Sequence, residues 1–146
     1  MATVIMEGHI PRMCPSVNEM YPVIHGHKIL SKEGQAFKNE AHEFIVDMWK
    51  KANMPGIPEG AMLRLDLWFR FKKVFTKGEK AKSRFIHLDV TNRVKIMEDA
   101  LQEALGFDDD QHFIVCERKM EGEPGIYFRL WVLDEPEEVP QWPGPT

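Results

Sequence analysis

HLDVTNRVKIMEDALQEALGFDDDQH, residues 87–112, is the segment around which the rest of the chain is organised. Its middle predicts one amphipathic helix from roughly Asn92 to Leu105, because apolar residues recur on one side at helical spacing. These residues are Val94, Met97, Leu101, Ala104 and Leu105. Such a stripe is typical of a helix that packs on a core.

The ends of this predicted helix are marked by a candidate N-cap, Thr91, and by Gly106, where a left-handed C-cap glycine belongs. The polar residues Asn92, Lys95 and Asp99 share the side opposite the apolar stripe. Acidic residues flank both ends, with Asp89 before the helix and Asp108, Asp109 and Asp110 after it. If the flanking segments are neighbouring strands, both acidic ends can approach the Lys95 side.

The whole chain has 146 residues, a length that fits one domain with a single core. Its formal net charge is -4, so the chain is not basic throughout. No signal peptide or membrane-length apolar run is visible, so we expect a soluble, cytoplasmic protein with no membrane partner. Cys14 and Cys116 lie far apart without a CxxC pattern, which predicts two buried free thiols rather than a zinc site or a disulfide. His25 and His27 are interpreted as solvated loop histidines rather than metal ligands.

Hydrophobic patterning predicts an α+β, two-layer β-α-β-β-α-β-β domain over residues 1–133, with the helices on one face of a mixed, largely antiparallel sheet. Strands are expected at Thr3–Ile10, Leu63–Phe71, Phe85–Leu88, Phe113–Cys116 and Ile126–Val132, and a further helix is expected from Ser31. Residues 11–29 read as a loop-like crossing. The last two strands are expected to pair as a hairpin. The acidic, proline-rich tail, residues 134–146, is expected to be extended or disordered.

The strand at residues 63–71 alternates strictly, which predicts one face in the core and one exposed. Arg64, Arg70 and Lys72 share the second face with Trp68, and we interpret it as a solvated face in preference to a nucleic-acid surface. A basic segment follows it. Its cations, candidates for neutralising DNA phosphates, are Lys72, Lys73, Lys77, Lys80, Lys82 and Arg84.

The acidic residues around the central helix are hard oxygen ligands, which suit Mg²⁺, or Mn²⁺ as an alternative, better than zinc. A carboxylate-bound cation beside a lysine is typical of the active site of a phosphodiester hydrolase, because both stabilise charge on a phosphate. The alternative from the residues alone is a solvated acidic loop after the helix, with Asp89 favoured by the helix dipole.

The pattern Asp89-Val-Thr-Asn92-Arg-Val-Lys95, followed by Asp99-Ala-Leu101 and by Asp108-Asp109-Asp110-Gln111, resembles the RusA family of Holliday-junction resolvases. That family's usual form is D-x-D-N-x-x-K, D-A-L, D-D-x-Q. Pro15–Tyr21 and Ser31–Phe37 are also similar to its N-terminal segments. The resemblance extends from about Pro15 to Leu133.

The resemblance implies a homodimeric, Mg²⁺-dependent endonuclease that acts on branched DNA and nicks four-way junctions on two symmetry-related strands. It assigns Asp89, Lys95 and Asp109 as catalytic, and Asp89 and Asp109 as metal ligands, with Asp108 and Asp110 as further candidate ligands. Asp110 is the alternative to Asp109, since an ungapped count from Asp89 reaches it. Asn92 and Asp99 match positions that support the site.

Thr91 is where this chain departs from the family pattern, because the second aspartate of D-x-D is here a neutral hydroxyl. One fewer carboxylate weakens a metal site unless another acid compensates. We therefore expect a variant nuclease site, supported by Thr91. Two alternatives remain: a branched-DNA-binding protein with weak or no nuclease activity, and a nuclease for flaps and forks.

Overall fold

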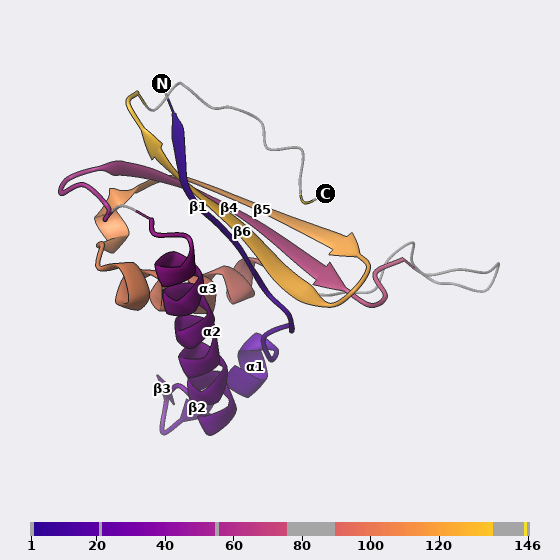
Figure 1. The fold of residues 1–146 in the computed structure, drawn as a ribbon. Helices are drawn as coiled ribbons and strands as arrows, with labels where there is room; N and C mark the ends of the chain where they lie inside the picture. Colours follow the sequence, from indigo (N-terminus) through magenta and orange to yellow (C-terminus); the bar gives the residue numbers. More distant parts are fainter. Residues whose placement is uncertain (1, 21, 55, 76–89, 136–144, 146) are drawn as a thin grey trace.

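The computed structural model describes residues 2–20, 22–54, 56–75, 90–135 and 145. Its elements in chain order are β1 (Thr3–Ile10), α1 (Val17–Met20), β2 (Val23–Ile24), β3 (His27–Lys28), α2 (Lys32–Lys51), β4 (Met62–Phe71), α3 (Thr91–Leu105), the 3-10 turn η1 (Asp109–Gln111), β5 (His112–Glu121) and β6 (Gly125–Leu133). The long helices α2 and α3 pack on one face of a four-stranded sheet (Figure 1). The predicted α+β, two-layer class is confirmed.

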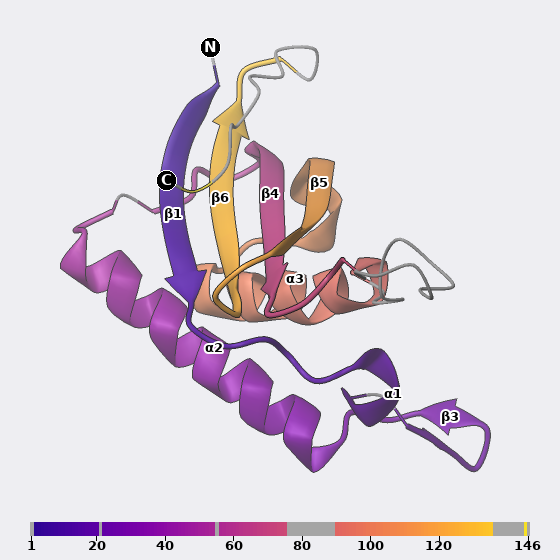
Figure 2. The same cartoon turned by 90° about the vertical axis from the view of Figure 1, so that its right-hand side faces the viewer.

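The sheet has the order β1-β6-β4-β5 and is mixed (Figure 2). β6 is antiparallel to both β1 and β4, whereas β5 is parallel to β4. The chain therefore returns from β4 to β5 through α3, the crossover that parallel neighbours need. The predicted strand at residues 85–88 lies outside the described residues, as does nearly all of the predicted tail.

The core lies between the helices and the inner face of the sheet. β4 contributes Leu63, Leu65, Leu67 and Phe69, and β6 contributes Ile126, Phe128 and Leu130, all fully buried. From α2 the buried side chains are Phe37, Ala41 and Ile45, and Ser31 caps this helix by accepting a hydrogen bond from the Gly34 N–H at 3.0 Å. The bounds of β1 are as predicted.

The predicted hairpin between the last two strands is wrong, because β4 lies between β5 and β6. The turn after β5 crosses the end of β4, where the Gly122 N–H donates to the Phe71 carbonyl at 2.8 Å. β5 is also longer than predicted, and none of its ten residues belongs to the buried apolar core; Phe113 is 53% and Val115 is 39% exposed. Its charged run Glu117–Lys119 is typical of an edge strand rather than of a strand leaving the core.

The second face of β4 is likewise less exposed than predicted, because Arg64 and Asp66 are buried with 4% and 3% exposure. The Arg64 guanidinium lies 3.1 Å from the Asp66 carboxylate, and the Trp131 indole N–H donates to the same carboxylate at 2.8 Å. Arg64 also lies over the Trp131 ring. Strict alternation could not distinguish this paired, covered arrangement from a solvated face.

Three smaller expectations need correction. Helix α3 begins at Thr91 itself, with Val90 in the N-cap position, so Thr91 is not the cap. Cys116 is half-buried, although Cys14 is buried as expected. The crossing at residues 11–29 contains α1 and a small β2–β3 hairpin, whose turn exposes His25 and His27. Among the described residues, no helix is long and apolar enough to span a membrane.

Replacing Asp66 by leucine is predicted to lower the free energy of unfolding by about 3–5 kcal/mol, because it removes one partner of a buried ion pair. The double change Arg64→Met with Asp66→Leu should cost less than the single change. Urea denaturation measures both. The matched control is Glu7→Gln, which breaks the more exposed pair with Arg129 and should cost at most about 1 kcal/mol. Equal losses for the single and double variants would contradict this account of the pair.

Candidate functional site

Helix α3 carries the polar residues singled out from the sequence, and its packing fixes which way they point. Its buried side is formed by Val94, Ile96, Met97, Ala100 and Leu101. The Val90 carbonyl accepts from the Arg93 and Val94 N–H groups, and Gly106 ends the helix at φ 76°. Lys95 and Asp99 therefore face away from the core, toward the edge strand β5.

A pocket of about 480 Å³ lies between α3 and β5. Its lining residues are Val94, Lys95, Glu98, Asp99, Asp109, Val115 and Glu117. It brings together three residues that are distant along the predicted motif: Lys95, Asp99 and Asp109. Four carboxylates share the pocket with one lysine, so its local charge is strongly negative.

Burial is the largest influence on two of these carboxylates. It raises the pKa of Glu98, and the nearby charges of Asp109, Asp99 and Glu117 raise it further. Burial also raises the pKa of Asp99, although Lys38 and Lys95 act in the opposite direction. The four carboxylates of the pocket outnumber its one lysine, and this composition favours a bound cation.

Asp109 is held at this pocket by α3 itself, because the Gln102 amide donates a hydrogen bond to the Asp109 carboxylate. Gln102 lies two turns after Lys95 along the helix, so one helix face presents the lysine and also positions the aspartate. This contact is the reason that Asp109, the first residue of η1, reaches back over the C-terminal half of α3.

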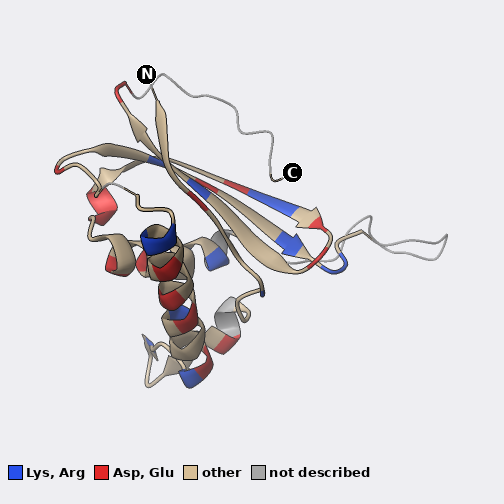
Figure 3. Ribbon diagram, in the orientation of Figure 1, with Lys and Arg blue, Asp and Glu red and all other residues tan. Residues whose placement is uncertain are grey.

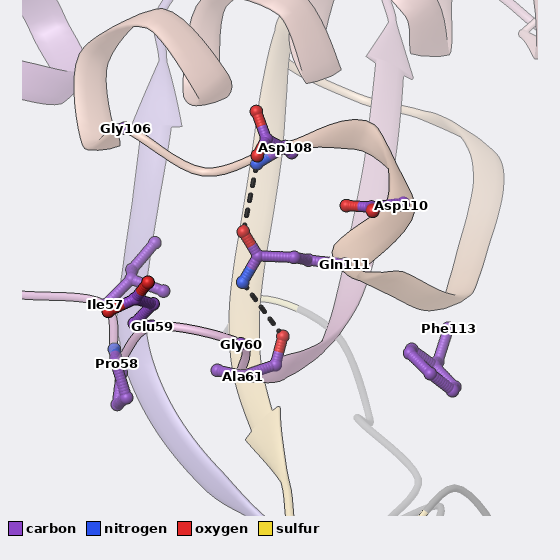
Figure 4. A pocket seen from close by; sticks show the side chains of 10 residues that line it. All are labelled: Ile57, Pro58, Glu59, Gly60, Ala61, Gly106, Asp108, Asp110, Gln111 and Phe113. Carbon is purple, nitrogen blue, oxygen red and sulfur yellow. Dashed lines mark hydrogen bonds between the residues drawn. The ribbon is translucent and has the colours of Figure 1, made fainter.

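Asp108 and Asp110 line a different pocket, of about 530 Å³, together with residues 57–61 (Figure 4). Gln111 connects the two sides of this second pocket. Its side-chain carbonyl accepts from the Asp108 N–H, and its amide donates to the Ala61 carbonyl, both at 3.0 Å. The three consecutive aspartates are thus divided, with only Asp109 beside Lys95.

The N-terminal segment that resembles the family is tied to the start of α3. The buried Arg93 guanidinium donates to the carbonyls of Cys14, at 2.6 Å, and Pro15, at 3.2 Å. It also lies over the Phe71 ring at the end of β4. Arg93 therefore joins the residues just before α1, the end of β4 and the helix that carries Lys95.

Several predicted site residues lie outside what the structure describes. Asp89 falls among residues 76–89, and the side chains of Thr91 and Asn92 are not described. The basic residues Lys77, Lys80, Lys82 and Arg84 fall in the same range. Lys72 and Lys73 are described, and both are exposed immediately after β4. Figure 3 shows basic residues on β4 and β5 near this end, whereas η1 is acidic.

The donor set of the α3–β5 pocket fits a hard divalent cation, since it consists of carboxylate oxygens that repel one another. Within the described ranges, no three His, Cys, Asp or Glu side chains are already gathered closely enough to hold an ion. Asp89 precedes α3 by two residues and lies outside those ranges.

The sequence reasoning missed three residues: Glu98, which lines the pocket, Gln102, which holds Asp109 there, and Glu117, which also lines the pocket. Helical spacing could have found the first two, because they lie three and seven positions after Lys95. Glu117 could not be found in this way. Its place follows from the parallel pairing of β5, which sets Glu117 opposite Leu67 on the helix side of the sheet.

Comparison with known protein families supports the resemblance. A family model described as Endodeoxyribonuclease RusA matches residues 12–130, which is most of the chain. No curated protein matches the chain significantly.

Proposed function

Because the chain belongs to the RusA endodeoxyribonuclease family, we propose that it is a divalent-metal-dependent nuclease that hydrolyses phosphodiester bonds in four-way DNA junctions. The observation that carries this proposal is the shared pocket of Lys95, Asp99 and Asp109 between α3 and β5. These residues come from separate parts of the family pattern and line the same pocket.

The proposed roles follow from chemistry and position. Asp89 and Asp109 hold Mg²⁺, or Mn²⁺ in its place, and Asp99 with Asn92 supports the site. A bound divalent cation stabilises the negative charge that builds on the phosphate in the transition state. The Lys95 ammonium group adds positive charge at the same pocket. Of the other acidic candidates, Asp108 and Asp110 are less favoured as ligands because they line the neighbouring pocket.

We further propose that the active form is a homodimer. A four-way junction has near two-fold symmetry, and an isologous dimer presents two equivalent sites to two equivalent strands. The basic segment that begins at Lys72 and Lys73 is the proposed DNA-contacting arm, because lysine and arginine side chains neutralise phosphates without reading bases.

A branched-DNA-binding protein without nuclease activity is the second candidate, and Thr91 favours it because this position lacks the family's carboxylate. A labelled synthetic junction distinguishes the two on one gel, run with and without Mg²⁺. The proposed nuclease yields symmetric nicks only with Mg²⁺, whereas a binding protein yields a shifted, uncut band. Flap and fork substrates in the same assay rank the remaining alternative.

Asp89→Asn and Asp109→Asn are each predicted to reduce Mg²⁺-dependent junction cleavage by about 100-fold or more, because each removes charge that holds the cation. Junction binding, measured by gel shift in Ca²⁺, should remain close to wild type. The matched controls are Asp108→Asn and Asp110→Asn, which alter the neighbouring pocket and should retain cleavage. Undiminished cutting by both Asp89→Asn and Asp109→Asn would exclude the proposed site.

Replacing Lys77, Lys80 and Lys82 by alanine is predicted to weaken junction binding and to flatten its salt dependence. If each lysine contacts one phosphate, the slope of log K against log salt should fall by about 2.7. Fluorescence anisotropy across a salt series measures this slope. The charge-matched control replaces the exposed Lys28, Lys32 and Lys51. An unchanged slope in the first variant would refute a role of this segment in DNA binding.

A further inference from the structure

Glu98 occupies the pocket between α3 and β5, but it does not belong to the D-x-x-N-x-x-K and D-A-L residues that match the family pattern. It lies one helical turn after Lys95 and next to Asp99 in sequence. Its side chain is 25% exposed and lines the pocket together with Asp109. The pocket therefore contains a carboxylate, that of Glu98, which does not belong to the family pattern.

His112 lies behind Glu98, at the start of β5. Its side chain is only 5% exposed, and its Nε2 atom lies 3.9 Å from the Glu98 Oε2 atom. Within the described part of the chain, neither ring nitrogen has a hydrogen-bond partner. Buried polar atoms without partners cost free energy, so such an arrangement indicates a contact that is completed in another state of the site.

His112 is able to donate a hydrogen bond to a carboxylate, because an imidazole ring carries at least one N–H group. The ring also packs edge-on against Phe107, with centroids 5.2 Å apart, which limits its freedom to turn away. For a hydrogen bond to form, the distance between His112 Nε2 and Glu98 Oε2 would have to shorten to about 2.9 Å.

The negative charge around Glu98 favours a bound cation in the pocket. Glu98 is partly buried among carboxylates from α3, η1 and β5, and Lys95 is the lysine that lines the pocket with them. A divalent cation held in the pocket would take one Glu98 carboxylate oxygen as a ligand, and the second oxygen could accept a hydrogen bond from His112.

We propose that Glu98 is a cation-binding carboxylate of this pocket and that His112 is its positioning residue. The inference rests on the proposed function, since it concerns the same cation. It gives the chain a carboxylate in place of the one that Thr91 does not supply. In many metal sites a carboxylate ligand also accepts a hydrogen bond from a residue that does not touch the metal, and His112 would have this role.

Direct binding of Mn²⁺ in the absence of DNA tests this proposal, by isothermal titration calorimetry of the full chain. Glu98→Gln keeps the shape of the side chain and should weaken Mn²⁺ binding by about tenfold or more, because losing a ligand should cost at least as much as losing a group that supports a ligand. The matched control is Glu103→Gln, on the same helix, where the carboxylate pairs with Lys38 outside the pocket. It should bind Mn²⁺ within about twofold of wild type.

Two substitutions test His112 separately. His112→Phe keeps the contact with Phe107 but removes both nitrogens, and should weaken Mn²⁺ binding by about tenfold without lowering the melting temperature. His112→Gln places an amide donor near the Nε2 position and should restore most of the affinity. Wild-type affinity in His112→Phe would overturn the positioning role.

Asp109→Asn distinguishes failure of this inference from failure of the proposed function. If Asp109→Asn weakens Mn²⁺ binding while Glu98→Gln does not, the role of Glu98 is excluded and the proposed nuclease site stands. If neither variant changes Mn²⁺ binding, the pocket is not the cation site and both proposals fail. Weaker binding in both variants, with Glu103→Gln unchanged, supports the role of Glu98.

Discussion

The pairing of β4 on both of its edges is the constraint on which the rest of the structure depends. β4 is antiparallel to β6 on one side and parallel to β5 on the other, and its inner face is fully apolar from Leu63 to Phe69. The parallel pairing requires a crossover, which α3 supplies. Because α3 is buried along one side, its other side faces the edge strand. The pocket of Lys95, Asp99 and Asp109 is a direct consequence.

The same pocket shows how packing can hold like charges together. The buried side of α3 fixes the rotation of the helix, and Gln102 draws Asp109 back onto it. Several carboxylates therefore line one pocket, and burial, together with neighbouring carboxylates, raises the pKa of Glu98 and of Asp99. The pocket is therefore negatively charged, although Lys95 and Lys38 lie close enough to Asp99 to offset part of this charge.

Much of the fold could be predicted from local signals. The bounds of β1, the start of a helix at Ser31 and the left-handed Gly106 all follow from short-range chemistry, and the structure confirms them. The order of strands could not be predicted, because it depends on which strands, distant in sequence, pair with β4. The sequence spacing between β5 and β6 favoured a hairpin, whereas the charged, exposed residues of β5 fit an edge.

The site was predictable in part for a similar reason. The helix face with Lys95 and Asp99 followed from periodicity, and the family was identified from residue types at fixed spacing, which the match over residues 12–130 confirms. The division of the three aspartates between two pockets follows from Gln102 and Gln111, whose contacts are tertiary. Glu98 was within reach of the helical pattern. Glu117 depended on the pairing of β5 with β4.

The most direct test of the central claim is an anomalous difference map from crystals grown with Mn²⁺. The account predicts a peak between α3 and β5, with a carboxylate oxygen of Asp109 about 2.0–2.6 Å from the ion. A peak between Asp108 and Asp110, with none in the pocket of Lys95 and Asp99, would contradict it.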